Sequence, residues 1–282
     1  MEKKRLINRL LSMLSNFRKI TCLILLGAFL VTSCNDDPAS LNSENPPEIP
    51  PVESMSVDVS TFNAYQQNKE ALGKESNTNF AQAAVRAFVI KSVVELNLAI
   101  PKALLAAASE SDAEFNEDGE WVWSYTKNAG NDTYEVRLVA TQENENEITW
   151  QFFVTNSALG LNDKLFFSGT TNSDGTEGTW TYYSLMSSSE EPVSITEWAV
   201  TEEGNVDLRL DVVSDRFNNE GDYIEYSFDG TVKNAVYYDG DEDTATELHW
   251  NIETNAGYII APNYNNGEKA CWDENFEDVS CE

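Results

Sequence analysis

The stretch EITWQFFVTN at residues 147–156 alternates apolar and polar side chains along its length. Its apolar positions include Ile148, Trp150, Phe152 and Val154. Because successive side chains of a β-strand point to opposite faces, a period of two predicts a strand with one buried and one solvent-facing side. One-sided burial of this kind is typical of antiparallel sheets.

The same period recurs between residues 120 and 262. Apolar positions elsewhere in this region include Trp121, Trp123, Tyr125, Tyr134, Val136, Leu138, Leu208, Leu210, Val212, Leu248, Trp250 and Ile252. Short runs at 117–119, 173–175, 203–205, 220–222 and 255–257 separate the segments, and their Gly, Asp and Asn residues tolerate the positive φ of tight hairpins. No interval suits a helical crossover, so the pattern predicts an antiparallel meander of roughly nine or ten strands.

A helical segment precedes the strands. Residues 78–100 contain no Gly or Pro, and one of residues 77–79 is expected to cap the helix start. Apolar side chains recur at helical spacing, and we expect them to pack against the sheet. They are Ala81, Val85, Phe88, Val89, Val93, Leu96 and Ile100. Pro101 predicts either a kink or the first position of a second helix over residues 101–109, and a short helix is expected between Asp58 and Leu72.

Together these patterns predict an α+β body in which an N-terminal helix or helix pair packs on a long antiparallel β-meander. A sheet of so many twisted strands tends to curl or close, so we expect a barrel or half-barrel. A single β-rich domain is predicted over residues 56–282, with helices within 60–109, strands within 120–262 and a disulfide-linked tail at 263–282.

The N-terminus has the features of an export signal. Six basic residues precede the apolar run Ile20–Val31, which at twelve residues is too short to span a bilayer. The sequence Val31-Thr32-Ser33-Cys34 that follows resembles the lipobox of bacterial lipoproteins. This resemblance implies that residues 1–33 are a removed signal peptide and that Cys34 carries acyl chains, which would anchor the chain to a membrane. The alternative is an ordinary signal peptide with a chance cysteine.

Residues 34–55 are predicted to be an acidic, Pro-rich tether, since they have little to bury. The acidic residues after Cys34 resemble the surface-export signal of Bacteroidota lipoproteins, so an outer-membrane protein at the cell surface is expected, with the periplasmic face as the alternative. The whole chain has 18 basic and 48 acidic residues, a net charge of −30. Nucleic acid is therefore a poor partner, because its binding requires a basic surface.

The cysteines fit an exported protein. Beyond the leader and Cys34, the remaining pair is Cys271 and Cys281, for which a disulfide is the default expectation. A metal or redox pair is the competing interpretation, although the spacing is not that of a Cys-x-x-Cys motif.

Candidate chemistry is sparse. No Gly-x-Ser-x-Gly motif is present, and His249 lies on the predicted polar face of a strand, where we expect it to be solvated. Asp239, Asp241 and Asp243 have the alternation of a calcium loop, but the positions that the EF-hand requires are not filled, and an acidic hairpin tip is the alternative. Asp273, Glu274, Glu277 and Asp278 form a second weak candidate.

Aromatic residues are the remaining signal. Core packing would explain them, but in a hollow barrel they would line a ligand pocket. The candidates are Trp123, Trp150, Trp180, Tyr182 and Trp250.

Several stretches resemble a group of uncharacterised outer-membrane lipoproteins of the Bacteroidota. They are Ser56–Phe62, Asn97–Pro101, Trp121–Tyr125, Gly175–Trp180 and Ala270–Asp273. The resemblance implies an anchored lipoprotein and carries no activity, ligand or catalytic residue. We therefore expect a non-enzymatic lipoprotein whose body binds an unidentified ligand or partner outside the membrane. The alternatives are a carrier of lipid or other apolar molecules, to whose fold the predicted curved sheet is similar, a structural or adhesion module, and an acid-pair hydrolase.

Overall fold

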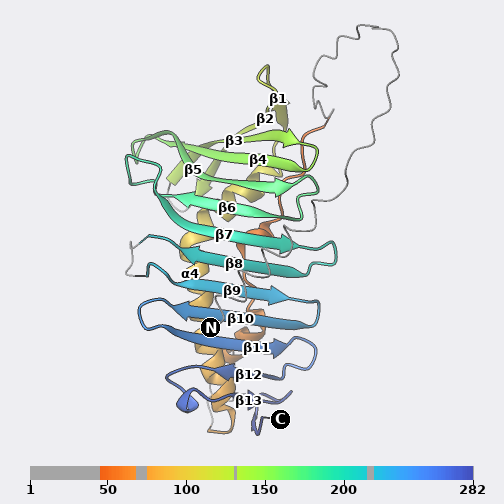
Figure 1. The fold of residues 1–282 in the computed structure, drawn as a ribbon, viewed down its shortest axis with the longest axis vertical. Coiled ribbons are helices and arrows are strands. Elements are labelled where there is room, and N and C mark those ends of the chain that lie inside the picture. Colours follow the sequence, from red (N-terminus) through yellow and green to blue (C-terminus); the bar gives the residue numbers. More distant parts are fainter. Residues whose placement is uncertain (1–44, 68–74, 130–131, 215–218, 282) are drawn as a thin grey trace, which may run out of the picture. The chain divides into compact units, whose positions relative to one another are not determined.

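A single long antiparallel sheet dominates the protein. The structure, a computed structural model, describes residues 45–67, 75–129, 132–214 and 219–281. The predicted leader, Cys34 and the first part of the tether lie outside these ranges. Within them, fourteen strands form one sheet in which each strand pairs antiparallel with the next in sequence order (Figure 1). The predicted meander is therefore confirmed.

The strands are β1 (Ala113–Phe115), β2 (Trp121–Ala129), β3 (Asp132–Asn144), β4 (Glu147–Asn156), β5 (Leu161–Asn172), β6 (Glu177–Tyr183), β7 (Pro192–Val200), β8 (Val206–Val212), β9 (Tyr223–Phe228), β10 (Val232–Asp239), β11 (Thr244–Asn251), β12 (Gly257–Ile260), β13 (Ala270–Trp272) and β14 (Asp278–Val279). The helical elements are η1 (Val52–Met55), η2 (Ser60–Phe62), α2 (Asn63–Gln67), η3 (Glu75–Asn77), α4 (Thr78–Ala108) and η4 (Asn265–Gly267). Eleven described strands, β2 to β12, fall in the region where nine or ten were expected.

The expected barrel does not form, because β1 and β14 are the two edges of an open sheet. Helix α4 crosses one face of this sheet (Figure 1). Near its end, the Leu104 carbonyl accepts a hydrogen bond from the Tyr125 hydroxyl of β2, and near its start Asn79 Nδ2 donates to the Cys271 carbonyl of β13. The helix between these two points is about 38 Å long at 1.5 Å per residue. It acts as a strut that keeps the two ends of the sheet apart.

Helix α4 is one continuous helix that passes through Pro101, so the predicted second helix over 101–109 is wrong. A proline inside a helix removes one backbone hydrogen bond and costs about 3 kcal/mol. Pro101 is buried, and Leu98, Leu104 and Leu105 beside it are also buried in the core. Their burial offsets the cost, because each fully buried leucine contributes about 1.5–3 kcal/mol.

The helix face that packs on the sheet is not the one expected from the sequence. Val85, Val89, Leu96 and Ile100 of the predicted stripe are among the exposed large apolar residues. The buried side chains of α4 instead include Phe80, Ala83, Ala84, Ala87, Ile90, Val94 and Leu98. Both sides of this helix are apolar, so the 3.6-residue period alone could not identify the buried one.

The segment before α4 belongs to the body. Ser54 and Met55 are buried, although both lie within the predicted tether, and Phe62 is fully buried. The expected short helix is present as η2 followed by α2, and residues 68–72 of its predicted range lie outside the described residues. The Lys233 side chain is only 5% exposed, and its Nζ lies 2.6 Å from Asp58 Oδ2. This ion pair links the segment to β10.

Candidate functional site

The outer face of the sheet, opposite α4, carries a groove of about 810 Å³ that is open to solvent. Its lining comes from β4 to β10 and includes Thr179, Glu197, Arg209 and Glu225. The strand registers align these four side chains: Thr179 pairs with Glu197, Glu197 with Arg209 and Arg209 with Glu225. Directly opposite residues of an antiparallel pair point to the same side, so the four form one row across the groove.

The groove wall is acidic. Five carboxylate side chains line it, and all five residues are exposed: Glu147, Glu177, Glu197, Asp207 and Glu225. The cation Arg209 is already neutralised by its neighbours. Its Nε and Nη2 donate to the two carboxylate oxygens of Asp211 at 2.9 and 2.7 Å, and its Nη1 donates to Glu225.

The Asp211 hydrogen bonds are the main reason that the pKa of Arg209 is raised. Its guanidinium carbon also lies 3.9 Å from the centre of the Tyr223 ring. Among the described residues, Glu147, Glu177, Glu197 and Asp207 have no cation within ion-pair distance. The groove therefore presents uncompensated negative charge to an incoming ligand.

Two glycines allow the strands under the groove to accept large indoles on the core side. A Cβ at Gly178 would lie 2.3 Å from the Thr170 carbonyl oxygen and 3.1 Å from the Trp198 ring. A Cβ at Gly169 would lie 1.9 Å from a backbone oxygen and 2.6 Å from the Trp180 ring. The indoles of Trp180 and Trp198 stack with their planes 15° apart, so they form a solid layer beneath the groove.

His249 lies on the outer face beside the groove, as expected, but it is half-buried rather than solvated. Its Nδ1 lies 2.6 Å from Oδ1 of Asn234, which lines the groove. Its ring stacks on Tyr258 at 4.8 Å between centroids. Burial, and then the charge of Lys269, lower the pKa of His249, so the neutral imidazole is favoured at pH 7. Its side-chain contacts are an amide and a phenol ring, and neither is a nucleophile.

The aromatic residues predicted as possible pocket lining are part of the core. Trp123, Trp150, Trp180, Tyr182 and Trp250 are each 0–3% exposed, and none of them lines the groove. Trp123 packs on Trp150 with ring centroids 5.8 Å apart, and Trp150 Nε1 donates to Thr171 Oγ1 at 2.9 Å. These residues were therefore assigned to the right elements, but they are packed against other core side chains.

The acidic clusters proposed for calcium serve the local backbone and neighbouring side chains. Asp239 Oδ1 accepts the backbone N–H groups of Asp241 and Glu242 at 3.1 and 3.0 Å, and Asp243 Oδ1 accepts the Tyr238 hydroxyl. Within the described ranges, no three His, Cys, Asp or Glu side chains come together as a metal site would require. In the second cluster, Asp273 Oδ1 accepts the N–H of Glu277 at 2.9 Å.

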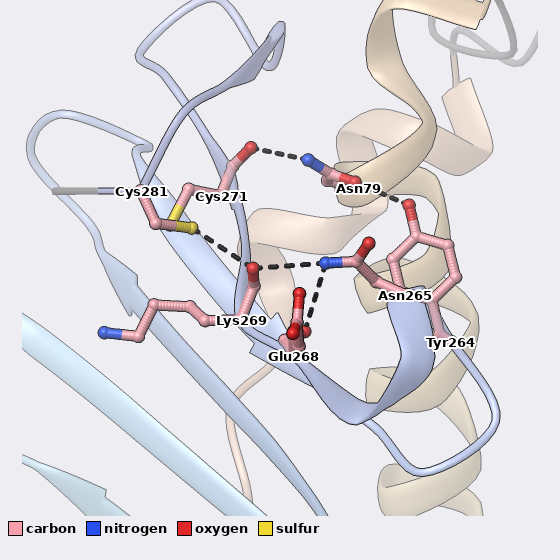
Figure 2. The surroundings of a disulfide bond; sticks show 7 residues. All are labelled: Asn79, Tyr264, Asn265, Glu268, Lys269, Cys271 and Cys281. Atoms are coloured by element: carbon pink, nitrogen blue, oxygen red, sulfur yellow. Dashed lines mark hydrogen bonds between the residues drawn. A yellow bond between two sulfur atoms is a disulfide. The ribbon is translucent and has the colours of Figure 1, made fainter.

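The disulfide between Cys271 and Cys281 is present, and it closes a loop against the start of α4 (Figure 2). Asn79 connects the two, because its Nδ2 donates to the Cys271 carbonyl at 2.7 Å while its Oδ1 accepts the Tyr264 hydroxyl. Asp278, inside the loop, accepts the backbone N–H groups of Thr78 and Asn79 at 3.2 and 2.8 Å. The cap of α4 is thus supplied from about 200 residues away, whereas we expected it from residues 77–79.

Among the described residues, no helix has the length and apolar character needed to cross a membrane. No protein family, curated protein or solved structure matches this chain.

Sequence reasoning missed the groove. Its residues occupy the polar positions of strands that were predicted correctly, but the sequence does not show which polar positions of different strands lie side by side. The signal that was available is the parity of the strands: Glu197, Arg209 and Glu225 all alternate with buried neighbours, so they had to share the outer face.

Proposed function

We propose that this chain is an outer-membrane lipoprotein without enzymatic activity, and that its body binds a cationic ligand in the outer-face groove. The observation that carries the proposal is the groove itself: an open concavity whose wall holds five carboxylates, with a cation that is already paired. The chain's strongly acidic composition supports the same polarity, because a negative surface raises the local concentration of positive ligands.

The core supports binding at the surface rather than inside the fold. The large aromatic side chains that would line an internal cavity in a carrier contact one another and the helix instead. No observation favours the carrier function over surface binding. The described candidate residues likewise support binding over catalysis, since His249 is paired with Asn234 and the groove carboxylates are exposed.

A short lysine peptide is a suitable probe for the groove. We expect calorimetry to detect its binding at low salt and a weaker affinity at 0.5 M salt, because the salt screens exposed charges. The double variant Glu197→Gln, Asp207→Asn should lower the affinity at least five-fold. The control is Glu190→Gln, Glu191→Gln, which removes the same charge from exposed positions between β6 and β7. Equal loss in both variants would show that only net charge matters, and would refute the groove.

The anchoring part of the proposal depends on Cys34, which lies outside the described residues. Cys34→Ser should shift the protein from the membrane fraction to the soluble fraction and remove the acyl mass from its N-terminus. If membrane fractionation and mass are both unchanged, Cys34 is not the lipidation site. Protease treatment of intact cells should digest the body if it is displayed at the surface, whereas complete protection would favour the periplasmic side.

A further inference from the structure

The side of α4 that faces away from the sheet is apolar along its middle. Val85 and Val89 are 51% and 48% exposed, Leu96 is 78% exposed and Ile100 is 38% exposed. The opposite side of the same helix is buried in the core. A helix that is apolar all round is typical of one covered on both sides. In the described part of the chain only one of its sides is covered.

The exposed side has the spacing of a helix–helix seam. Six positions follow one another at alternating intervals of four and three residues: Val85, Val89, Ser92, Leu96, Ala99 and Ala103. An average repeat of 3.5 residues is the period of a coiled-coil a/d seam, and it differs from the wider apolar face expected of a helix lying on lipid. None of the six is charged. We call these six residues the α4 seam.

We propose that the α4 seam joins two copies of this chain as an antiparallel helix pair related by a twofold axis. Placing the axis at residue 94 brings every seam position opposite another one, and each larger side chain then faces a smaller one. The facing pairs are Val85 with Ala103, Val89 with Ala99, and Leu96 with Ser92, each formed twice. Alternation of large and small residues across facing positions is what close packing requires.

A parallel pairing of the same seam fits less well. It would place each residue opposite its own copy, so Ser92, Ala99 and Ala103 would face equally small side chains and leave gaps. Leu96 would face Leu96 of the other copy and hold the helices apart at that level. An isologous interface in which one residue contacts a different residue of the other copy is the usual arrangement of a twofold dimer.

Charge also favours this face for association between copies. The chain has 48 acidic and 18 basic residues, so most of its surfaces repel a second copy. Helix α4 is different, because it carries three basic residues, Arg86, Lys91 and Lys102, and one acidic residue, Glu95. Glu95 lies beside the proposed axis, and Lys91 Nζ is 3.5 Å from its carboxylate oxygen, which offsets part of the repulsion between the two Glu95 side chains.

The size of the seam predicts a reversible dimer. From residue 85 to residue 103 the helix extends about 27 Å, and it is about 10 Å wide. This strip is smaller than a standard interface of about 800 Å² per partner, so we expect association in the micromolar range rather than an obligate dimer.

Sedimentation velocity of the full-length chain in mild detergent tests the proposal. The sedimentation coefficient should rise from monomer to dimer with concentration, and Leu96→Glu should weaken the dimer at least ten-fold. Met186→Glu is the matched control, because Met186 is 84% exposed and the charge change is the same. Circular dichroism checks that both variants fold. A chain that stays monomeric up to 100 µM, or a dimer that Leu96→Glu leaves intact, would overturn the proposal.

Thiol crosslinking then tests the direction of the pair. Two differently tagged full-length copies, one with Val89→Cys and the other with Ala99→Cys, should form a mixed disulfide that mass spectrometry identifies by its peptides. Val89→Cys alone should not link to itself. Self-linking without the mixed product would overturn the antiparallel arrangement.

A flotation assay with phosphatidylethanolamine–phosphatidylglycerol vesicles tests a different occupant. Monomeric chain whose vesicle binding depends on Leu96 would mean that the seam faces lipid, which contradicts the dimer.

Discussion

Removal of the Cys271–Cys281 disulfide should destabilise the protein by an amount that its loop length sets. The two cysteines are 10 residues apart, and the chain-entropy relation for a loop of that size gives about 2.8 kcal/mol at 25 °C. A body of about 230 residues unfolds with an entropy of about 0.5 kcal/mol/K, so the melting temperature should fall by about 6 °C. The double variant Cys271→Ser, Cys281→Ser avoids leaving a reactive thiol.

The structure adds a second consequence. Asp278, which accepts the first N–H groups of α4, lies inside the disulfide loop, and Phe276 beside it packs on Phe80 with ring centroids 4.2 Å apart. If the loop frays in the double variant, the helix loses its cap as well, at a further cost of about 1 kcal/mol. Asp278→Asn alone, with the disulfide intact, isolates this contribution and should lower the melting temperature by about 2 °C.

Differential scanning calorimetry gives the melting temperatures, and limited proteolysis locates the change. We expect new cleavage between residues 273 and 281 in the double serine variant and little in Asp278→Asn. The reasoning would be refuted if the double variant melted within 1 °C of the unmodified chain and resisted the protease equally. In that case the tail would be held by its strand pairing alone.

Two further predictions concern the core and the groove. Hydrogen bonds from Lys233 and Ser60 outweigh the effect of burial and lower the pKa of Asp58 below 3.8, so Asp58 stabilises the fold above that value and loses its contribution as pH falls through the lowered pKa. Asp58→Asn should therefore melt lower than the unmodified chain at pH 7, and the difference should vanish in strong acid; a constant difference across pH would contradict this. Gly178→Ala puts a methyl group 2.3 Å from the Thr170 carbonyl oxygen, and urea unfolding should show a loss of about 1–3 kcal/mol. An unchanged midpoint would mean that the two strands separate without cost.

Helix α4 shows where inference from the sequence ended. Its start at Thr78 was predicted, because a run without Gly or Pro begins there. The stripe chosen for burial was the exposed one, since Val85, Val89 and Leu96 are as apolar as the residues that pack on the sheet. Only the position of the sheet, fixed by contacts such as that between Tyr125 and Leu104, distinguishes the two sides.

The candidate site shows the same division. The polar parity of Glu197 and Arg209 can be read along each strand, but their alignment into one row depends on the registers of three neighbouring pairs. Hairpin turns of known length fix a register only approximately from sequence, and a bulge such as the one at Phe152 and Phe153 shifts it. The groove could not be located before the sheet was assembled.

The sequence by itself determined the antiparallel meander, its turns and the disulfide, because each depends on local alternation, on residues that accept special φ angles, or on a single remaining pair of cysteines. Only the tertiary structure decided that the sheet stays open, which face of α4 is covered and where the acidic groove lies. These features arise because one long helix, fastened to β2 at one end and to the C-terminal tail at the other, fixes the distance between strands far apart in the chain, and no local pattern encodes that distance.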